Sequence, residues 1–389
     1  MVSQVNFTDL PQGLTSKRII DLALLINGIP VVHIEEKDEH LQNQWHAFEQ
    51  LKGYHYDGLY VGLFSFVQVQ CIMSQHSAHY LARPNHPEHY NKTFVFGWRD
   101  ERNKDITDAF EFTHQVLGIP ALHRLVTVNM IPDASNDNLM VMRSYQIQAT
   151  RSILQRMKEM DTNGLIEKEG GYVWHTTGSG KTVTSFKVAQ LLASAPKVRN
   201  ILFIVDRVDL VDQTLENFKD FAYTHFQDRI KKVNGSELKR ALKHQGASQI
   251  LLITVQGLTK AVKSGLENSD WNVIIMDEAH RSANGESVQL IKQAFPKTTW
   301  FGFTGTPNFY SDELNDVQTT RDISTHDIFG KRLHTYTIKD AIGDGNVLGF
   351  DITYFKPHWV VENPPEGFSE QAYEKEVYQS LPYREEVVD

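Results

Sequence analysis

The segment HTTGSGKT, residues 175–182, combines the residue types that bind phosphate. It follows an apolar run and opens a helical one, so its glycines would let successive backbone N–H groups close around an anion at a helix N-terminus. In this pattern Lys181 would reach the β- and γ-phosphates of a nucleotide, and Thr182 would hold magnesium. The loop itself would be formed by Thr177, Gly178, Ser179 and Gly180. His175 stands where the usual pattern has glycine, and the alternative is a Gly-Ser turn that caps a helix beside an incidental lysine.

The segment NVIIMDEAH, residues 272–280, places acidic residues at the carboxyl end of an apolar strand. Ligands of α/β sheets bind at that end. Asp277 suits the magnesium shell, Glu278 suits polarising an attacking water, and His280 ends the motif. The alternative is a polar strand end with a helix cap. It becomes negligible because the two motifs occur in the order of one nucleotide site, with ATP and Mg²⁺ as cofactors.

Charged residues also interrupt the run DLALLINGIPVVHIEEK, residues 21–37, which is otherwise apolar enough to be buried. An Asp on one strand followed by Glu-x-Lys on the next is the PD-(D/E)xK nuclease pattern. Asp21 and Glu35 would hold a divalent metal, and Lys37 would position the attacking water or stabilise charge at the phosphate. Taken alone, this pattern is more often a solvated strand edge.

The hairpin must also bring these charges to one face. A two-residue turn at Asn27–Gly28 would place Asp21 and Glu35 on opposite faces, because side chains alternate along a strand. We therefore predict a three-residue turn with a bulge, in which Gly28 takes a positive φ. Asp21 would then pair with Glu35, and Lys37 would share their face.

The elements that position these motifs fall into two patterns. Residues 1–115 predict strands, a helix over 38–54 with Asp38 as N-cap and an apolar stripe, and further strands. That stripe consists of Leu41, Trp45, Phe48 and Leu51. Residues 116–140 contain two prolines and a polar cluster and predict a connection. From 141 to 345, short apolar strands alternate with helices, which predicts a parallel sheet covered on both faces, and 346–389 completes no domain.

Bulk properties set broad limits. The 389 residues are 41% hydrophobic, enough for two or three domains. A net charge of −9 argues weakly against nucleic acid, although a local basic groove can coexist with an acidic exterior. Cys71 is the single cysteine, so a reducing cytoplasm fits. The start is not a signal peptide, and no segment could span a bilayer, so we expect no membrane partner.

Several segments resemble superfamily 2 helicase motifs, and the His175 form of the loop is common there. FGFTGTP, residues 301–307, resembles motif III, with Thr304 and Thr306 linking nucleotide state to DNA grip. RSYQIQA, residues 143–149, resembles the adenine-reading segment, in which Gln146 would hydrogen-bond the base and Arg143 or Tyr145 would pack on it. The segments at 205–213 and 253–258 resemble motifs Ia and Ib, which contact the DNA backbone.

The hairpin followed by AFEQLKGY resembles the restriction (motor) subunit of type I restriction–modification enzymes. Gln50 and Tyr54 match that family's Q-x-x-x-Y element beside the nuclease site, and their i, i+4 spacing shares a helix face. Residues 94–112 and 334–354 resemble later segments of the same family, so the resemblance runs from about residue 5 to 354. It implies a PD-(D/E)xK nuclease-like α/β domain followed by a RecA-like P-loop domain.

The resemblance also implies a type I site-specific deoxyribonuclease. Its members translocate double-stranded DNA at the expense of ATP, cleave it far from the recognition site, and assemble with modification and specificity subunits. The family has helices before the hairpin and a second RecA-like domain with an arginine finger. We therefore expect the chain to be truncated at both ends, and to bind nucleotide alone with little DNA-stimulated turnover.

Two other functions stay open. One is a stand-alone superfamily 2 helicase or remodeller, in which Asp21, Glu35 and Lys37 would not converge. The other is a non-catalytic remnant that binds nucleotide or partner subunits.

Overall fold

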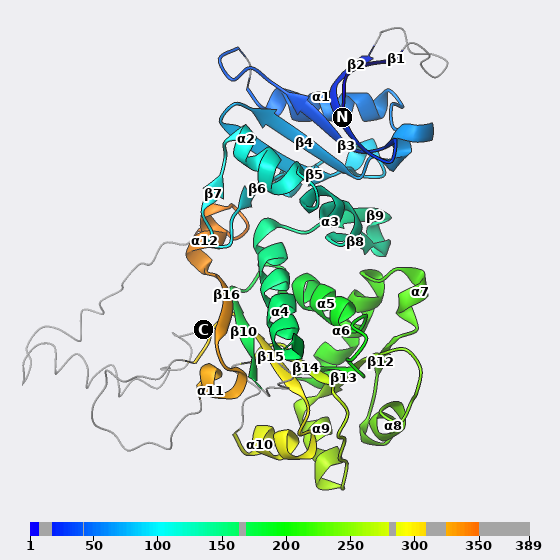
Figure 1. Ribbon diagram of the computed structural model, residues 1–389, viewed down its shortest axis with the longest axis vertical. Helices are drawn as coiled ribbons and strands as arrows, with labels where there is room; N and C mark the ends of the chain where they lie inside the picture. Colours follow the sequence, from blue (N-terminus) through cyan, green and yellow to red (C-terminus); the bar gives the residue numbers. More distant parts are fainter. Residues whose placement is uncertain (8–17, 42, 163–168, 280–284, 309–323, 350–389) are drawn as a thin grey trace, which may run out of the picture. The chain divides into compact units, whose positions relative to one another are not determined.

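The computed structural model of the chain describes residues 1–7, 18–41, 43–162, 169–279, 285–308 and 324–349. Residues Met1–Val347 form one compact unit (Figure 1), and the second unit, Leu348–Asp389, lies almost wholly outside the described residues. The described strands of the first unit form two seven-stranded sheets and a two-stranded hairpin. None of the described helices is long and apolar enough to cross a membrane.

The first sheet consists of strands β1 to β7, which lie side by side in chain order. All neighbours are antiparallel except β3 and β4, which are parallel and are joined through helix α1, Trp45–Tyr56. The strands are β1 (Val2–Phe7), β2 (Arg18–Ile26), β3 (Ile29–Glu36), β4 (Val69–Ser74), β5 (Ser77–Ala82), β6 (Phe96–Arg99) and β7 (Asp105–Ile106).

Helices cover both faces of this sheet. On one face Phe48 and Leu51 of α1 pack against Ile72 of β4. On the other, α2 (Ala109–Phe112), the π-helix η4 (Thr113–Leu117) and α3 (Ala121–Thr127) pack on β3, β4 and β5. The short 3₁₀ segments are η1 (Gly62–Phe66), η2 (Pro87–His89), η3 (Lys92–Phe94) and η5 (Ala134–Asn136). Because both faces are covered, strand β4 is buried along its whole length.

Helix α1 begins later than the sequence predicts. Gln44 is its N-cap, whereas the Asp38 carboxylate accepts a hydrogen bond from the backbone N–H of His40, two residues on. Leu41, predicted on the buried stripe, is exposed, while Phe48 and Leu51 are buried. The prediction of Asp38 as N-cap is therefore wrong. Asp forms such local turns readily, and here the turn takes the oxygen that a cap would need.

The stretch predicted as a connection, residues 116–140, has structure of its own. It contains α3 and strand β8 (Met130–Asp133), which pairs with β9 (Asn138–Val141) in an antiparallel hairpin. Leu122 and Leu125 of α3 and Ile131 of β8 lie in the same apolar cluster as the first sheet. This stretch therefore completes the core on one face of that sheet.

The second sheet is parallel throughout, as the sequence predicts, in the order β12-β13-β11-β14-β15-β10-β16. Its strands are β10 (Glu169–His175), β11 (Ile201–Val205), β12 (Ile230–Lys232), β13 (Ile250–Thr254), β14 (Val273–Met276), β15 (Thr299–Thr304) and β16 (Arg332–Tyr336). Five of them match apolar runs of the sequence, GYVWHTT, NILFIVD, SQILLITVQ, WNVIIMDEA and TWFGFTGT, from which the sheet is predicted. The two edge strands, β12 and β16, match none of these runs.

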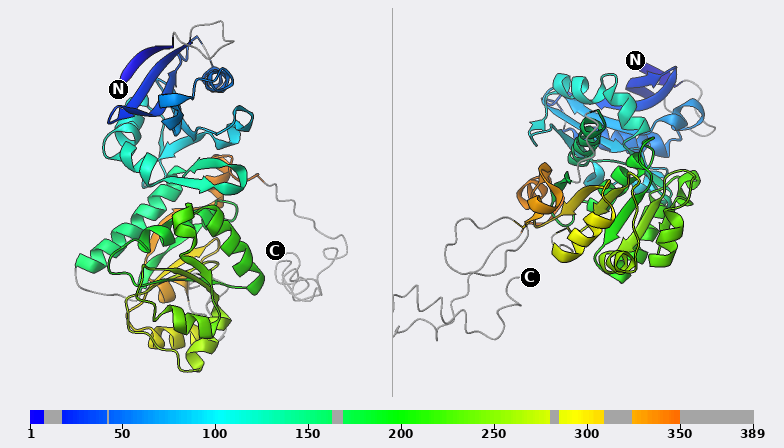
Figure 2. Two further views of the ribbon diagram at one scale, coloured as in Figure 1. Left: turned by 90° about the vertical axis from the view of Figure 1, so that its right-hand side faces the viewer. Right: turned by 60° about the horizontal axis from the view of Figure 1, so that its bottom comes forward.

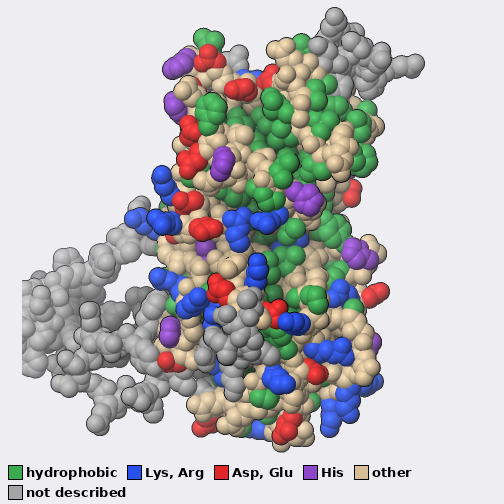
Figure 3. All heavy atoms as spheres, in the orientation of Figure 1, with side chains coloured by type: hydrophobic (Ala, Val, Ile, Leu, Met, Phe, Trp, Pro, Cys, Tyr) green, Lys and Arg blue, Asp and Glu red, His purple; other side chains and the backbone are tan. Residues whose placement is uncertain are grey.

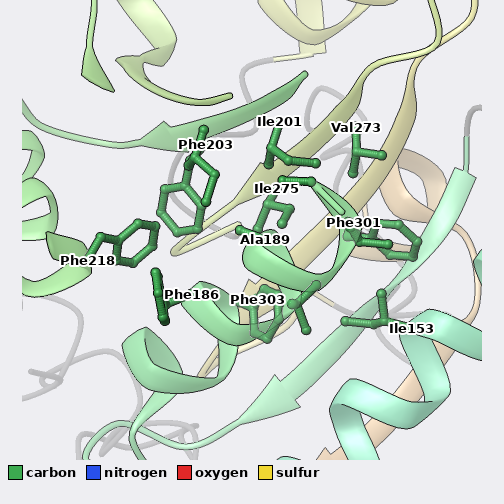
Figure 4. Packing of buried hydrophobic residues seen from close by; sticks show 14 of the residues in the cluster. Ile153, Phe186, Ala189, Ile201, Phe203, Phe218, Val273, Ile275, Phe301 and Phe303 are labelled. Atoms are coloured by element: carbon green, nitrogen blue, oxygen red, sulfur yellow. The ribbon is translucent and has the colours of Figure 1, made fainter. Parts of the chain in front are cut away.

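Helices lie on both sides of the second sheet (Figure 2). They are α4 (Ser144–Thr162), α5 (Lys181–Leu192), α6 (Val208–Asp220), α7 (Thr224–Gln227), α8 (Gly235–Ala241), α9 (Val255–Lys263), α10 (Gly285–Ala294) and α11 (Thr325–Phe329). Helix α12 (Ile338–Gly343) lies beside strand β7 (Figure 1). On one face Phe186 of α5 and Phe218 of α6 pack around Phe203 of β11 (Figure 4), whose ring centroid lies 4.7 Å from that of Phe218. On the other, Leu258 of α9 and Phe329 of α11 lie in a second cluster. Strands covered on both faces must be apolar throughout, which explains their uninterrupted runs.

Candidate active sites

The turn of the β2–β3 hairpin has two residues. Asn27 and Gly28 both have positive φ, 51° and 83°, and they connect the paired residues Ile26 and Ile29. Positive φ at both central positions is the geometry that Asn-Gly favours in a tight hairpin. The predicted three-residue bulged turn is therefore wrong.

The extra residue lies further along the hairpin. Leu25 pairs with Pro30 but Leu24 pairs with Val32, so Val31 is an additional residue in β3, a β-bulge. Beyond the bulge Leu22 pairs with Ile34. Continuing this register sets Asp21 opposite Glu35, which is the predicted pairing reached by a different route.

Asp21, Glu35 and Lys37 converge. The Lys37 ammonium lies 3.5 Å from Glu35 Oε2 and 3.7 Å from Asp21 Oδ2. The backbone N–H of Glu36 donates to Asp21 Oδ2 at 3.0 Å, and Lys37 Nζ also donates to the Glu36 carbonyl at 3.1 Å. Two carboxylates and one ammonium thus share one side of the hairpin end. The single positive charge of Lys37 offsets part of the negative charge of the two acids.

Glu35 has a fully buried side chain. Its Oε1 accepts a hydrogen bond from His33 Nε2 at 2.8 Å, leaving Oε2 toward Lys37. Burial raises the pKa of the Glu35 carboxyl, the hydrogen bond and charge of His33 oppose that rise, and the nearby Asp21 adds to it. A cation between the two acids would favour the charged form of both.

Gln50 and Tyr54 of α1 adjoin this site. The Gln50 amide donates to the Tyr54 hydroxyl, as their spacing on one helix face allows, and the hydroxyl donates to the Ile19 carbonyl at 2.7 Å. The Tyr54 ring stacks on His33, with centroids 5.6 Å apart and planes 27° apart. Tyr54 therefore reaches Glu35 through His33, and Gln50 does so through Tyr54. The sequence interpretation overlooked His33, although its i, i+2 spacing from Glu35 puts both residues on one strand face.

The donor set of the hairpin fits magnesium. No group of three or more His, Cys, Asp or Glu side chains forms a metal cage among the described residues. Magnesium, however, is commonly held by one or two carboxylates while water and substrate phosphates fill its remaining positions. Asp21 and Glu35 supply that number of carboxylates.

The predicted phosphate-binding loop joins β10 to α5. Gly178 and Gly180 have φ of 79° and 77°, a left-handed conformation that side chains rarely adopt. A Cβ at Gly180 would also lie 2.7 Å from the Gln146 amide nitrogen. No side-chain hydrogen bond caps α5 in the described part of the chain, so the N–H groups of its first turn, which includes Lys181 and Thr182, are available to phosphate oxygens.

Lys181 and the acidic motif meet at the carboxyl edge of the sheet, as predicted. Lys181 Nζ lies 3.4 Å from Glu278 Oε1. Burial, and next the charge of Glu278, raise the pKa of Asp277 to about 6, while Lys181 lowers it. Glu278 has a φ of 49°, which is uncommon for a residue with a side chain and costs backbone strain of the kind found at functional sites. His280 lies outside the described residues.

The Thr304–Thr306 turn touches the phosphate loop. Thr304 is fully buried, and its hydroxyl accepts a hydrogen bond from the backbone N–H of Thr306 at 3.2 Å. The Gly305 carbonyl accepts one from the Trp174 indole at 3.0 Å. A Cβ at Gly305 would lie 3.2 Å from Thr177 Oγ1 and 3.5 Å from Lys181 Nζ. A side chain at Gly305 would therefore crowd Thr177, and the turn predicted to be motif III lies against the predicted phosphate-binding loop.

The predicted adenine-reading segment caps the same loop. The Gln146 amide donates to the Ser179 carbonyl at 3.3 Å, and its Oε1 accepts from the backbone N–H of Arg143 at 3.0 Å. Tyr145 donates to the Ser179 carbonyl at 2.7 Å, and its buried ring stacks on Tyr336 at 3.6 Å between centroids. Of the two residues predicted to pack on the base, Tyr145 is therefore engaged within the protein.

A mainly apolar cavity of about 250 Å³ opens beside this segment. Arg143 and Gln146 line it together with the loop glycines, and the Arg143 guanidinium lies 4.8 Å from the centre of the Phe96 ring. Further lining comes from Leu139, Met140, Met142 and Val183. Strand β6 of the first sheet and the β8–β9 hairpin thus contribute walls that sequence motifs of the motor did not indicate.

His175 is a packing residue at the end of β10. It is fully buried, its Nε2 lies 3.0 Å from Nδ1 of His334 in β16, and its ring meets that of Tyr145 edge-on. Burial, and next the charge of His334, lower the pKa of His175 well below its usual value. The ring anchors the loop to strand β16, which explains why glycine is not required at this position.

Two families of known proteins match different parts of the chain. The SWI2/SNF2 ATPase family matches residues 145–378, and the type I restriction enzyme R protein N terminus matches residues 1–89. The chain is 37% identical to the type I restriction enzyme SsaAORF53P endonuclease subunit of Staphylococcus saprophyticus and 38% identical to the SauCOLORF180P endonuclease subunit of Staphylococcus aureus (strain COL). Each alignment covers 87% of this chain and 35% of the relative.

The chain thus spans about a third of the length of these relatives. Among solved structures, a nuclease-deletion mutant of the type ISP restriction-modification enzyme LlaGI in complex with a DNA substrate mimic is 20% identical, covers 53% of this chain and 20% of that chain, and has a TM-score of 0.39. The family match over more than half of the residues coincides with the parallel sheet and its nucleotide loop. The chain therefore belongs to the SWI2/SNF2 ATPase family, and its residues 1–89 are similar to the N terminus of the type I restriction enzyme R protein.

Proposed function

We propose that this chain is the nuclease and first motor portion of a type I restriction endonuclease subunit, which translocates double-stranded DNA with ATP and cleaves it away from the recognition site. One observation carries the proposal: a carboxylate–lysine cluster and a P-loop paired with an Asp-Glu motif occur on one chain. The proposed domains are residues 1–115, nuclease-like, with the predicted connection 116–140 packed on their sheet; 141–345, RecA-like; and 346–389, a bridge and the start of a second motor domain.

In the motor, Lys181 neutralises the β- and γ-phosphates while the N–H groups of the loop and of α5 bind phosphate oxygens. Thr182 and Asp277 hold Mg²⁺, which neutralises charge on the phosphates when bound. Glu278 orients and polarises the attacking water. The base enters the cavity beside Gln146 and Arg143.

Thr304 and Thr306 transmit the state of the nucleotide, since their turn touches the loop. The proposed DNA track follows the carboxyl ends of β11, β12 and β13. A groove of about 530 Å³ lies there, lined by Lys232, Lys239 and Lys260 together with the starts of α6 and α9. Figure 3 shows Lys and Arg side chains spread over the surface around the second sheet. These cations would hold DNA phosphates, despite a net charge of −9 for the whole chain.

In the nuclease, Asp21 and Glu35 hold Mg²⁺ and Lys37 stabilises negative charge at the scissile phosphate. Gln50 and Tyr54 support the site from α1. The proposed partners are duplex DNA and the modification and specificity subunits, in the cytoplasm.

The experiment uses the complete endonuclease subunit assembled with its partner subunits. Glu35→Gln should abolish DNA cleavage but leave ATP-driven translocation intact, and Lys181→Ala should abolish both. Glu36→Gln is a matched control, because Glu36 is exposed and adjacent but points away from the cluster. Cleavage at the wild-type rate by Glu35→Gln would contradict the nuclease assignment.

The two other functions make different predictions. A helicase with a merely DNA-binding N-terminal region requires that Asp21, Glu35 and Lys37 lie apart, and their separations of 3.5 and 3.7 Å do not favour it. A non-catalytic remnant binds nucleotide or partner subunits without ATP turnover, and an ATPase assay of this chain against the complete subunit separates it from the other two functions.

A further inference from the structure

We propose that His33 is a positioning residue of the nuclease site, which holds one oxygen of the Glu35 carboxylate and thereby turns the other toward the catalytic cation. This inference rests on the proposed nuclease function. His33 is fully buried on the strand face that carries Glu35, and its Nε2 lies 2.8 Å from Glu35 Oε1. Its other nitrogen, Nδ1, lies 2.7 Å from the Tyr60 hydroxyl.

The hydrogen bonds around His33 form one chain with a single direction. The Tyr90 hydroxyl donates to Gln70 Oε1 at 3.0 Å, and the Gln70 amide donates to the Tyr60 hydroxyl at 2.6 Å. Tyr60, having accepted one bond, has its own proton to donate to His33 Nδ1. A neutral His33 then carries its proton on Nε2 and donates it to Glu35. Every donor in the chain thus meets an acceptor, and the chain ends on a carboxylate.

Packing fixes the His33 ring in this orientation. Tyr54 stacks on it, and Tyr60 lies against it with centroids 5.9 Å apart. Because Tyr54 is anchored to the Ile19 carbonyl, the stack is tied to strand β2, which also carries Asp21. The ring therefore has little freedom to release the carboxylate.

The consequence concerns the Glu35 oxygen that faces the cation. With Oε1 held by His33, Oε2 is directed toward the space shared by Asp21 and Lys37. Partners that orient a metal ligand in this way typically change metal affinity by about 10- to 100-fold when they are removed. His33 should therefore affect how tightly the cation binds as well as how fast DNA is cut.

The test compares three variants of the complete endonuclease subunit. His33→Phe keeps a ring to stack on Tyr54 but loses both hydrogen bonds. Tyr60→Phe leaves His33 in place and removes the hydroxyl that donates to His33 Nδ1 and accepts from the Gln70 amide. His55→Phe is a matched control, since His55 lies edge-on to the Tyr60 and Tyr90 rings, 5.2 and 5.8 Å between centroids, but is not a member of the hydrogen-bond chain that ends on Glu35.

Binding is measured with Mn²⁺ by electron paramagnetic resonance, without nucleotide and in an Asp277→Asn background that removes the motor's metal ligand. Glu35→Gln, which defines the site, should lose one bound Mn²⁺. His33→Phe should weaken Mn²⁺ binding about 10- to 100-fold, Tyr60→Phe by a smaller factor of roughly 3 to 10, and His55→Phe not at all. With Asp277 restored, the Mg²⁺ concentration for half-maximal cleavage should rise in the same order, with DNA-stimulated ATPase unchanged.

The outcomes separate the two proposals. If Glu35→Gln binds Mn²⁺ as the parent does, the nuclease assignment itself fails. If Glu35→Gln loses the site but His33→Phe and Tyr60→Phe bind Mn²⁺ as tightly as His55→Phe does, the role of His33 is overturned. Should His33→Phe fail to fold, as lost ATPase would reveal, Tyr60→Phe decides by the same criterion.

Discussion

Removing a single oxygen atom from Tyr145 tests whether the predicted adenine-reading segment, residues 143–149, stabilises the conformation of the loop between β10 and α5. Tyr145→Phe deletes the hydroxyl that donates to the Ser179 carbonyl at 2.7 Å but keeps the ring on Tyr336, where the two planes lie 9° apart. The change therefore keeps the packing of the helix and removes the bond to the loop, together with a longer bond of 3.3 Å that the hydroxyl accepts from Arg143 Nη1.

The expected magnitude follows from what remains. A buried neutral hydrogen bond contributes about 1 kcal/mol to stability, and the Ser179 carbonyl keeps a longer bond from Gln146 at 3.3 Å. Loss of the hydroxyl should therefore lower the free energy of unfolding by about 1 kcal/mol. If the bond favours the loop conformation that binds phosphate, ATP affinity should fall by up to about fivefold, the factor that corresponds to 1 kcal/mol.

Tyr80→Phe provides the matched control. Tyr80 is also a buried tyrosine whose hydroxyl donates to a backbone carbonyl at 2.9 Å, but its acceptor is Met142 and not a residue of the loop. Both variants should lose similar stability in chemical denaturation, and only Tyr145→Phe should bind a fluorescent ATP analogue more weakly. Equal nucleotide affinities in the two variants would refute the proposed role of Tyr145.

Three further predictions follow. Burial lowers the pKa of Lys187 from 10.5 to about 8, so between these pH values the unfolded chain binds a proton that the native state has released. The free energy of unfolding of the wild type should therefore rise with pH by up to about 3 kcal/mol relative to Lys187→Met. Parallel pH profiles of the two proteins in urea denaturation would contradict this. Gly305→Ala should crowd Thr177 and weaken ATP binding roughly tenfold in calorimetry, whereas Gly97→Ala, with open space around its Cβ, should not. Glu278→Gln should bind ATP normally but hydrolyse it at least about 100-fold more slowly in a phosphate-release assay, and near-normal turnover would exclude it as the group that polarises water.

The motor half could be predicted from sequence because its physical signals are local and redundant. Strands buried on both faces must be apolar throughout, and a glycine loop after one of them places Lys181 at the carboxyl edge. Edge strands lack that signal. Strand β16 alternates buried and partly exposed residues and pairs on one side only, with β10, so no continuous apolar run marked it within the predicted sheet. Sequence analysis therefore also missed Tyr336 and His334 of this strand, which contact Tyr145 and His175 beside the loop.

The N-terminal half was harder because its site depends on contacts between distant segments. The series of hydrogen bonds from Tyr90 to His33 passes through Gln70 of β4 and through Tyr60, which lies between α1 and η1. These residues form no sequence motif. The role of a polar residue in a strand such as β4 cannot be inferred until the side chains that contact it are known. Only the i, i+2 spacing of His33 and Glu35 was available beforehand, and it indicates a shared face but no hydrogen bond.

The bulge at Val31 shows how a correct requirement can be met at an unexpected position. The charges demand one extra residue between Asp21 and Glu35, and the glycine of the turn was the obvious place for it. Asn-Gly, however, already satisfies a two-residue turn, with positive φ at both positions. The overlooked signal was Pro30, because proline has no N–H for the ladder and is found in strands mainly at edges, first residues and bulges. The shift in pairing follows directly after it. A proline shortly after a tight turn therefore locates the register change, and here it sets which face Glu35 occupies.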